Sequence, residues 1–262
     1  MKIERKKYIV AVLRLLILSI SLGFYIYVYL QYHKTVIRQK FIHIDYSNNH
    51  HFIDKEIVDQ LLFPKGEMPK DIAEIDPAKL EKYLESYPHI KNAEVYLGVD
   101  GTLYADIYQI NPIAKIYNQK NEMFYLNDDG SFAPKSEKYT ARVLVVNGNV
   151  IIDSQSPFNI LKQASHDSSK QYTQWKEIYD LAHFIYSKPF WNKQIQQIHV
   201  NKDFEYELMG SIGNHTIVLG KPYPLSGKFT KLMIFYQKAL PVVGWSKYQE
   251  IKLKYNNQII CK

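Results

Sequence analysis

The sequence predicts an α+β protein: a single N-terminal transmembrane helix, a β-α-α-β-β module, and then a mainly antiparallel β domain with two helices. Three observations favour this arrangement. A long apolar run lies near the N-terminus, two amphipathic helical stretches with capping residues follow it, and alternating apolar and polar residues dominate the remainder. Strands and helices segregated along the chain are typical of α+β folds. The domain boundaries expected from these patterns are 1–40, 41–112 and 113–262.

The apolar run Tyr8–Leu30 contains a single charged residue, Arg14. As a helix it would extend about 34 Å, which is enough to cross a hydrocarbon core about 30 Å thick. Arg14 lies close enough to the start of the run to reach the lipid headgroups. A cleaved signal peptide would have a shorter run followed by small residues. The segment therefore predicts a membrane anchor, and tyrosines mark its far end as an interfacial belt would: Tyr25, Tyr27, Tyr29 and Tyr32.

The net charge of the protein, +7, lies entirely in its first 40 residues, which hold eight Lys or Arg and one acid. The basic residues ahead of the apolar run slightly outnumber those after it, so the positive-inside bias favours a cytoplasmic N-terminus. The remaining chain is electrically balanced and offers no basic surface for nucleic acid. Cys261 is the only cysteine, which excludes an internal disulfide.

The β-α-α-β-β module has recognisable local signals for each of its elements. Phe41–Tyr46 alternates as a short strand, and Asp54 is a suitable N-cap for the helix that follows it. Asp76 and Pro77 start a second amphipathic helix. Two alternating runs on either side of Asp100–Gly101 predict a β-hairpin, since Asp-Gly supplies the backbone conformations of a tight turn.

The second domain reads as successive strands interrupted by two helices, 171–188 and 227–240. Its last segment, Ile251–Lys262, again alternates, and Ile251, Leu253 and Tyr255 are expected to pack inward. Asn256–Asn257 is either a tight turn of a hairpin or a bulge in one long strand. Ile259 and Ile260 are adjacent, so both faces of the final strand carry an apolar side chain.

Candidate catalytic and metal-binding residues do not form a recognisable set. His43, His50 and His51 lack the spacing of known zinc sites, which favours a solvated loop. Asp128–Asp129, followed by Gly130, is more typical of a turn than of a carboxylate pair. We therefore predict no catalytic residue, no metal, no cofactor and no small-molecule substrate, and the sequence favours a binding protein over an enzyme.

Four stretches in this order resemble the FtsQ/DivIB family of bacterial cell-division proteins. They are IDPAKLEKYLESYPHIKNAEVYLGVDGTLYADI (75–107), NPIA (111–114), FYLNDDG (124–130) and IKLKYNNQII (251–260). By this resemblance the first module is a POTRA domain and the second is the family's β domain. The chain departs from the family where Gln109–Ile110 replaces Glu-Arg and where Lys252–Leu253–Lys254 replaces Asp-Leu-Arg, and lysine does not reproduce a bidentate arginine contact.

The resemblance implies a non-enzymatic, bitopic scaffold of the divisome that links early and late division proteins. It further implies a single pass of the bacterial inner membrane, a cytoplasmic N-terminus, a periplasmic body, a septal location, and small coiled-coil partners similar to FtsB and FtsL. Two other classes of protein stay open. One is a POTRA-bearing component of protein translocation or outer-membrane assembly, and the other is a membrane-anchored enzyme.

The resemblance also implies where partners bind. In this family an FtsB strand adds to the terminal sheet edge, with a tyrosine at the position of Tyr255, so the predicted site is Lys254, Tyr255, Asn256, Asn257, Gln258, Ile259 and Ile260. In modules of this kind Ala93–Val99 would form an open edge. We predict a secondary site for other membrane division proteins there, at Val95 and Leu97, and a capped edge without a partner is the alternative.

Overall fold

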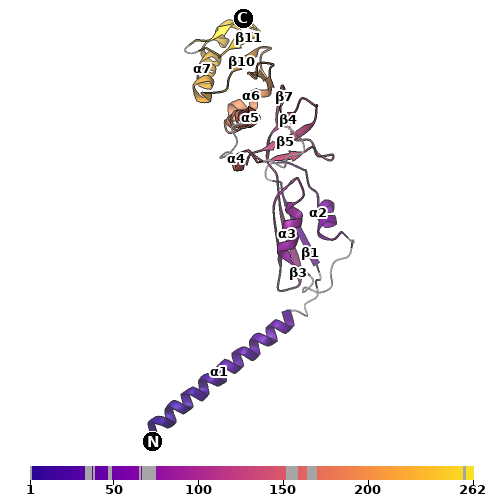
Figure 1. Cartoon of the computed structure of the whole chain (residues 1–262), viewed down its shortest axis with the longest axis vertical. Coiled ribbons are helices and arrows are strands. Elements are labelled where there is room, and N and C mark those ends of the chain that lie inside the picture. The colour runs from indigo at the N-terminus through magenta and orange to yellow at the C-terminus, as the bar shows by residue number, and fades with distance from the viewer. Residues whose placement is uncertain are drawn as a thin grey trace. The chain divides into compact units, whose positions relative to one another are not determined.

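The computed structural model describes residues 2–32, 37, 39–46, 49–64, 66, 75–151, 159–163, 170–255 and 258–262. The chain divides into two compact units (Figure 1). Unit 1 comprises Met1–Ser47 and Ile53–Gln109, and unit 2 comprises Asn48–Phe52 and Ile110–Lys262. Each unit has its own sheet and its own buried core.

Helix α1 (Lys2–Tyr32) begins the chain, and its window Val12–Tyr29 is apolar and long enough to cross a membrane. None of this window is buried against the rest of the protein. The hydroxyls of Ser19 and Ser21 donate to the carbonyl oxygens of Leu16 and Leu18, each at 2.9 Å. Polar groups that are satisfied within their own helix suit an apolar surrounding.

The sheet of unit 1 has three strands in the order β1-β3-β2. Strand β1 (Gln39–Asp45) is parallel to β3 (Thr102–Gln109), and β2 (Ile90–Leu97) is antiparallel to it. Helices α2 (Lys55–Leu62) and α3 (Pro77–Glu85) complete the predicted β-α-α-β-β order.

Local signals in the sequence start these helices where predicted. The Asp54 carboxylate accepts the backbone N–H of Ile57 at 2.8 Å and caps α2. Asp76 caps α3 in the same way, and Pro77 is its first residue. Capping replaces the hydrogen bonds that the first turn of a helix lacks. In the turn between β2 and β3, Gly101 adopts φ 82°, which the Asp-Gly pair anticipates.

Alternation along the strands divides the unit 1 sheet into a buried face and an outer face. The buried face packs with apolar residues of both helices, and each buried Val, Leu or Ile side chain stabilises the fold by about 1.5–3 kcal/mol relative to exposure. The buried residues are Ile42, Ile44, Ala93, Val95, Leu103, Ala105 and Ile107 from the strands, and Val58, Leu62 and Leu84 from the helices.

Unit 2 has nine described strands in one sheet, in the order β12-β11-β10-β9-β8-β7-β4-β5-β6. The strands are β4 (Pro112–Tyr117), β5 (Met123–Asn127), β6 (Phe132–Pro134), β7 (Leu144–Gly148), β8 (Ile195–Val200), β9 (Tyr206–Gly210), β10 (Thr216–Gly220), β11 (Glu250–Lys252) and β12 (Ile260–Cys261). Its helices are α4 (Ile160–Gln163), α5 (Lys170–Tyr186), α6 (Pro189–Gln194), α7 (Leu225–Lys238) and α8 (Leu240–Val243). The predicted helices are α5 and α7, and the three short helices α4, α6 and α8 were not predicted.

Most pairings in this sheet are antiparallel, as predicted, but β4–β7, β7–β8 and β10–β11 are parallel. The chain passes through α4, α5 and α6 between β7 and β8, and through α7 and α8 between β10 and β11. Such crossovers are right-handed almost without exception. Both crossovers start from strands that run in the same direction, β7 and β10, and both lead to a neighbouring strand on the β12 side. The two crossovers therefore place their helices on the same face of the sheet. Figure 1 shows α5, α6 and α7 along one side of the sheet.

Candidate partner-binding edges

Strand β12 forms one edge of the nine-stranded sheet, next to β11. The two strands are antiparallel, with Ile251 opposite Cys261 and Lys252 opposite Ile260. Lys262 and Glu250 exchange both backbone hydrogen bonds, at 3.0 and 3.1 Å. The chain therefore reverses direction between β11 and β12, which excludes one long strand. The turn expected at Asn256–Asn257 lies outside the described residues.

The pairing determines which backbone groups of β12 face outward. Residues in an antiparallel pair alternate between bonding their neighbour and pointing away from it. Lys262 bonds Glu250, so the backbone N–H and C=O of Cys261 point away from β11, toward the free edge. If the same alternation continues along the chain, the backbone N–H and C=O of Ile259 also point toward the free edge. An edge with unpaired backbone groups can accept a further strand.

The side chains beside this edge differ from the prediction at one position. Ile251 and Leu253 are fully buried, as expected, but Tyr255 is 45% exposed rather than packed inward. The reason is that β11 ends at Lys252, so the strand alternation does not continue to Tyr255. Ile260 is 41% exposed on β12, while Ile259 packs against the core.

Two lysines hold the backbone and side chains around Tyr255. The Lys231 ammonium, on α7, donates to the Tyr255 carbonyl oxygen at 2.9 Å. The Lys254 ammonium contacts the Glu205 carboxylate at 2.6 and 2.8 Å, and this hydrogen bond raises the pKa of Lys254. The segment after β11 is therefore attached to α7 on one side and to the turn before β9 on the other.

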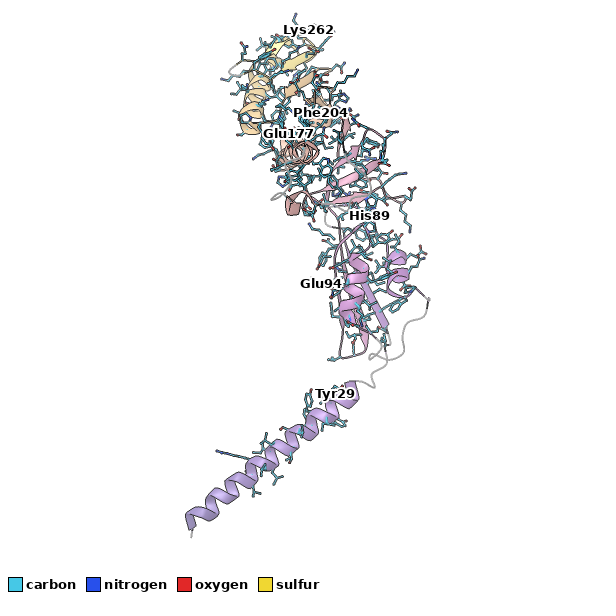
Figure 2. All side chains as sticks on the ribbon, in the orientation of Figure 1. Tyr29, His89, Glu94, Glu177, Phe204 and Lys262 are labelled. Carbon is cyan, nitrogen blue, oxygen red and sulfur yellow. The ribbon has the colours of Figure 1, made fainter. Side chains whose placement is uncertain are left out.

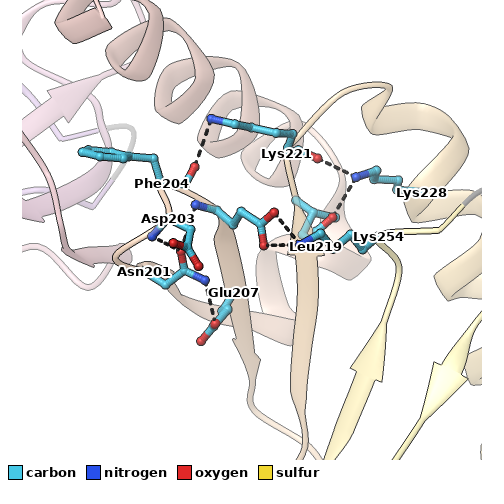
Figure 3. A network of polar contacts seen from close by, with 9 residues as sticks. Asn201, Asp203, Phe204, Glu207, Leu219, Lys221, Lys228 and Lys254 are labelled. Atoms are coloured by element: carbon cyan, nitrogen blue, oxygen red, sulfur yellow. Dashed lines mark hydrogen bonds and ion pairs between the residues drawn. The ribbon is translucent and has the colours of Figure 1, made fainter.

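A wider polar network surrounds the Lys254 contact (Figure 3). The buried Lys228 ammonium donates to the carbonyl oxygen of Leu219 at 2.7 Å and to that of Lys221. Lys221 in turn donates to the carbonyl oxygen of Phe204 at 3.1 Å. Burial lowers the pKa of Lys228. These bonds fix the end of β10, the strand on which β11 is built.

Five residues of the predicted C-terminal site lie along this described segment. They are Lys254, Tyr255, Gln258, Ile259 and Ile260, whereas Asn256 and Asn257 lie outside the described residues. Four of them are exposed, namely Lys254, Tyr255, Gln258 and Ile260, and Ile259 is half-buried. The other two predicted residues, Val95 and Leu97, belong to unit 1 and are not part of this group.

Strand β2 is an edge of the unit 1 sheet, but two of its outward backbone groups already have partners. The N–H of Val95 donates to the Glu81 carboxylate at 2.9 Å, and that of Ala93 donates to Glu85 at 3.3 Å. The Val95 side chain is buried in the core. An added strand would have to displace both carboxylates, and the predicted docking at Val95 and Leu97 stays a prediction.

The histidines lie in ordinary polar and aromatic surroundings. His43 Nδ1 is 3.3 Å from an Asp106 oxygen, and His50 and His51 pack near the Tyr139 ring. Burial lowers the pKa of His50. Within the described part of the chain, no three His, Cys, Asp or Glu side chains are placed to hold a metal ion.

Comparison with known families explains this architecture. Residues 111–262, more than half of the chain, match the family described as FtsQ/DivIB, C-terminal related. The chain belongs to the FtsQ/DivIB family. Residues 36–108 match a POTRA-like domain, so unit 1 of this FtsQ/DivIB protein has the predicted POTRA character. No curated protein matches the chain.

Proteins of the FtsQ/DivIB family are non-enzymatic scaffolds, and membership in it suggests a cell-division scaffold. Helix α1 suggests that this FtsQ/DivIB protein is anchored in a membrane. Sequence reasoning missed Glu81 and Glu85, which accept backbone N–H groups of the β2 edge, and Glu205, which contacts Lys254 after β11. The spacing of Glu81 and Glu85 did put both on one face of a helix. No sequence signal linked Glu205 to Lys254, because only the folded sheet brings them together.

Proposed function

We propose that this FtsQ/DivIB protein is a bitopic scaffold of the divisome that links early and late division proteins and binds a small coiled-coil partner similar to FtsB, together with an FtsL-like protein. The observation that carries the proposal is the outward edge of β12, with Tyr255 and Ile260 exposed beside it. A partner strand would add to the edge through the backbone groups of Ile259 and Cys261. The exposed side chains would supply apolar contact.

Several contacts are needed to hold such a strand. Each backbone hydrogen bond contributes only about 0.5–1.5 kcal/mol net, so an aromatic anchor must add to them, and Tyr255 is placed for that role. Because the Tyr255 carbonyl oxygen is bound by Lys231, the residue is held in position before a partner arrives.

Proline at position 259 tests the edge directly. In the full-length protein, Ile259→Pro removes one outward donor and should abolish binding of the FtsB-like partner in co-purification from membranes. Ile259→Val keeps the donor and should bind normally. Tyr255→Ala should weaken binding, whereas Phe190→Ala, at a similarly exposed ring on α6, should not. Unchanged binding by Ile259→Pro would refute strand addition at β12.

The location and topology of the protein need separate tests. A fluorescent fusion of the full chain should form a septal band, whereas uniform envelope fluorescence would favour the alternative role in protein translocation or outer-membrane assembly. Protease added to spheroplasts should digest residues 41–262. Protection of this body would contradict a cytoplasmic N-terminus with a periplasmic body.

A further inference from the structure

The outer face of the unit 1 sheet is the side that α2 and α3 do not cover. Its side chains alternate with the buried ones along most of the three strands, and at the bulge of β2 the consecutive residues Lys91 and Asn92 are both exposed. The residues on this open face are Gln39, Phe41, His43 and Asp45 on β1, Tyr104, Asp106 and Tyr108 on β3, and Asn92, Glu94 and Tyr96 on β2.

Three aromatic side chains form one row across the open face. Phe41, Tyr104 and Tyr96 lie directly opposite one another on neighbouring strands. The rings of Tyr96 and Tyr104 stack with centroids 5.1 Å apart at an angle of 9°, and Phe41 lies 6.0 Å from Tyr104. Phe41 is 57% exposed and Tyr96 is 48% exposed. A contiguous exposed aromatic row of this kind marks an interaction surface.

The next row of the same face is acidic. Asp106 lies between His43 and Glu94, and Glu94 is labelled in Figure 2. The Asp106 carboxylate lies 3.3 Å from His43 Nδ1. Partial burial and this carboxylate raise the pKa of Tyr96, so the phenol stays protonated. With Asp45, the ten named positions carry three carboxylates and no Lys or Arg, and the exposed Lys91 lies at the bulge at one end of β2.

We propose that the open face binds an arginine-bearing protein segment of a partner. A guanidinium packs flat against an aromatic ring and also pairs with carboxylates in a fork, so one arginine can use both rows. One face of the Tyr96 ring is stacked on Tyr104, and β2 is the edge strand, so the other face is turned outward. Glu94 lies two residues away on the same side of the sheet.

Charge favours this occupant over others. Three carboxylates repel an anionic lipid surface, a nucleic acid, and the same face of a second copy of the chain. A cationic segment is attracted, and its arginines replace the water around the rings. This inference uses unit 1 alone and does not depend on the role proposed for the β12 edge.

The test uses the full-length protein in nanodiscs of phosphatidylcholine and a fluorescein-labelled peptide of alternating arginine and serine. Fluorescence anisotropy should detect binding that weakens with salt. The lysine version of the peptide should bind less tightly, because lysine lacks the planar stacking group. Tyr96→Ala should weaken binding of the arginine peptide about two- to fivefold. The double variant Glu94→Gln, Asp106→Asn should weaken it about three- to tenfold.

Matched variants separate this face from general effects. Tyr83 on α3 is also 48% exposed, so Tyr83→Ala should bind as the wild type does, as should Glu56→Gln on α2. Tyr96→Phe keeps the ring and should retain binding, which controls for folding. Equal binding by wild type, Tyr96→Ala and the double variant would overturn the proposal. The proposal would also be overturned if the protein does not bind the arginine peptide but binds another ligand through Tyr96. Such a ligand would be a chitin oligosaccharide, a phosphatidylglycerol vesicle or a second copy of the chain, and Tyr96→Ala would abolish its binding.

Discussion

Replacing Glu81 and Glu85 by alanine should open the free edge of β2 and destabilise unit 1. Both carboxylates accept backbone N–H groups of that edge, at 2.9 Å from Val95 and 3.3 Å from Ala93. Each bond is worth about 0.5–1.5 kcal/mol net. The longer hydrogen bond is the one that Glu85 accepts. Because Glu85 is exposed, the free energy of this bond lies at the low end of that range. We expect the double variant to lose about 1–2 kcal/mol of unfolding free energy.

The assay is urea unfolding of the full-length protein in detergent, combined with hydrogen exchange of peptides that cover 90–97. The double alanine variant should exchange faster in this strand and should self-associate more, since an open edge pairs readily. Glu81→Gln with Glu85→Gln is the matched control, because the amide oxygen still accepts the backbone donors. If the alanine and glutamine variants show equal stability and equal exchange, the carboxylates do not cap the edge.

Two further predictions concern the core of unit 2. Burial lowers the pKa of His215 below the value of about 6.5 in an unfolded chain, so the unfolded state takes up the proton first and stability falls as pH decreases through that value. His215→Gln cannot titrate and should flatten the change in urea midpoint between about pH 7.5 and pH 5.5. The buried Tyr206 hydroxyl donates to Glu177 at 2.9 Å, and Tyr206→Phe should cost about 1–3 kcal/mol in urea unfolding. Tyr223→Phe, at an exposed tyrosine bonded to Asp180, should cost less. A flat pH profile for the wild type, or equal losses from the two tyrosine variants, would contradict these assignments.

Features encoded by neighbouring residues could be predicted from the sequence. Asp54 and Asp76 start helices because a carboxylate three residues ahead reaches the first free N–H groups. Asp100–Gly101 forms the predicted turn between β2 and β3. The alternating runs on either side of this turn are the strands β2 and β3.

Features that depend on distant residues could not be predicted. The parallel pairs within the larger sheet follow from helical crossovers, whose position in the sheet no local pattern encodes. Tyr255 was expected in the core because the alternation of Ile251 and Leu253 runs on through it, but the strand ends first. Its anchoring by Lys231 depends on where α7 lies.

The parallel pairing of β1 with β3 has a consequence for how unit 1 assembles. Residues 46–101 separate the two strands, so their pairing requires closure of a long loop, whereas β2 and β3 meet through a short turn. We therefore expect β1 to join the sheet last during folding. A slip of β1 by one residue would turn Phe41 toward the helices and Lys40 outward. The last strand to dock thus decides whether the open face presents an aromatic ring or a positive charge.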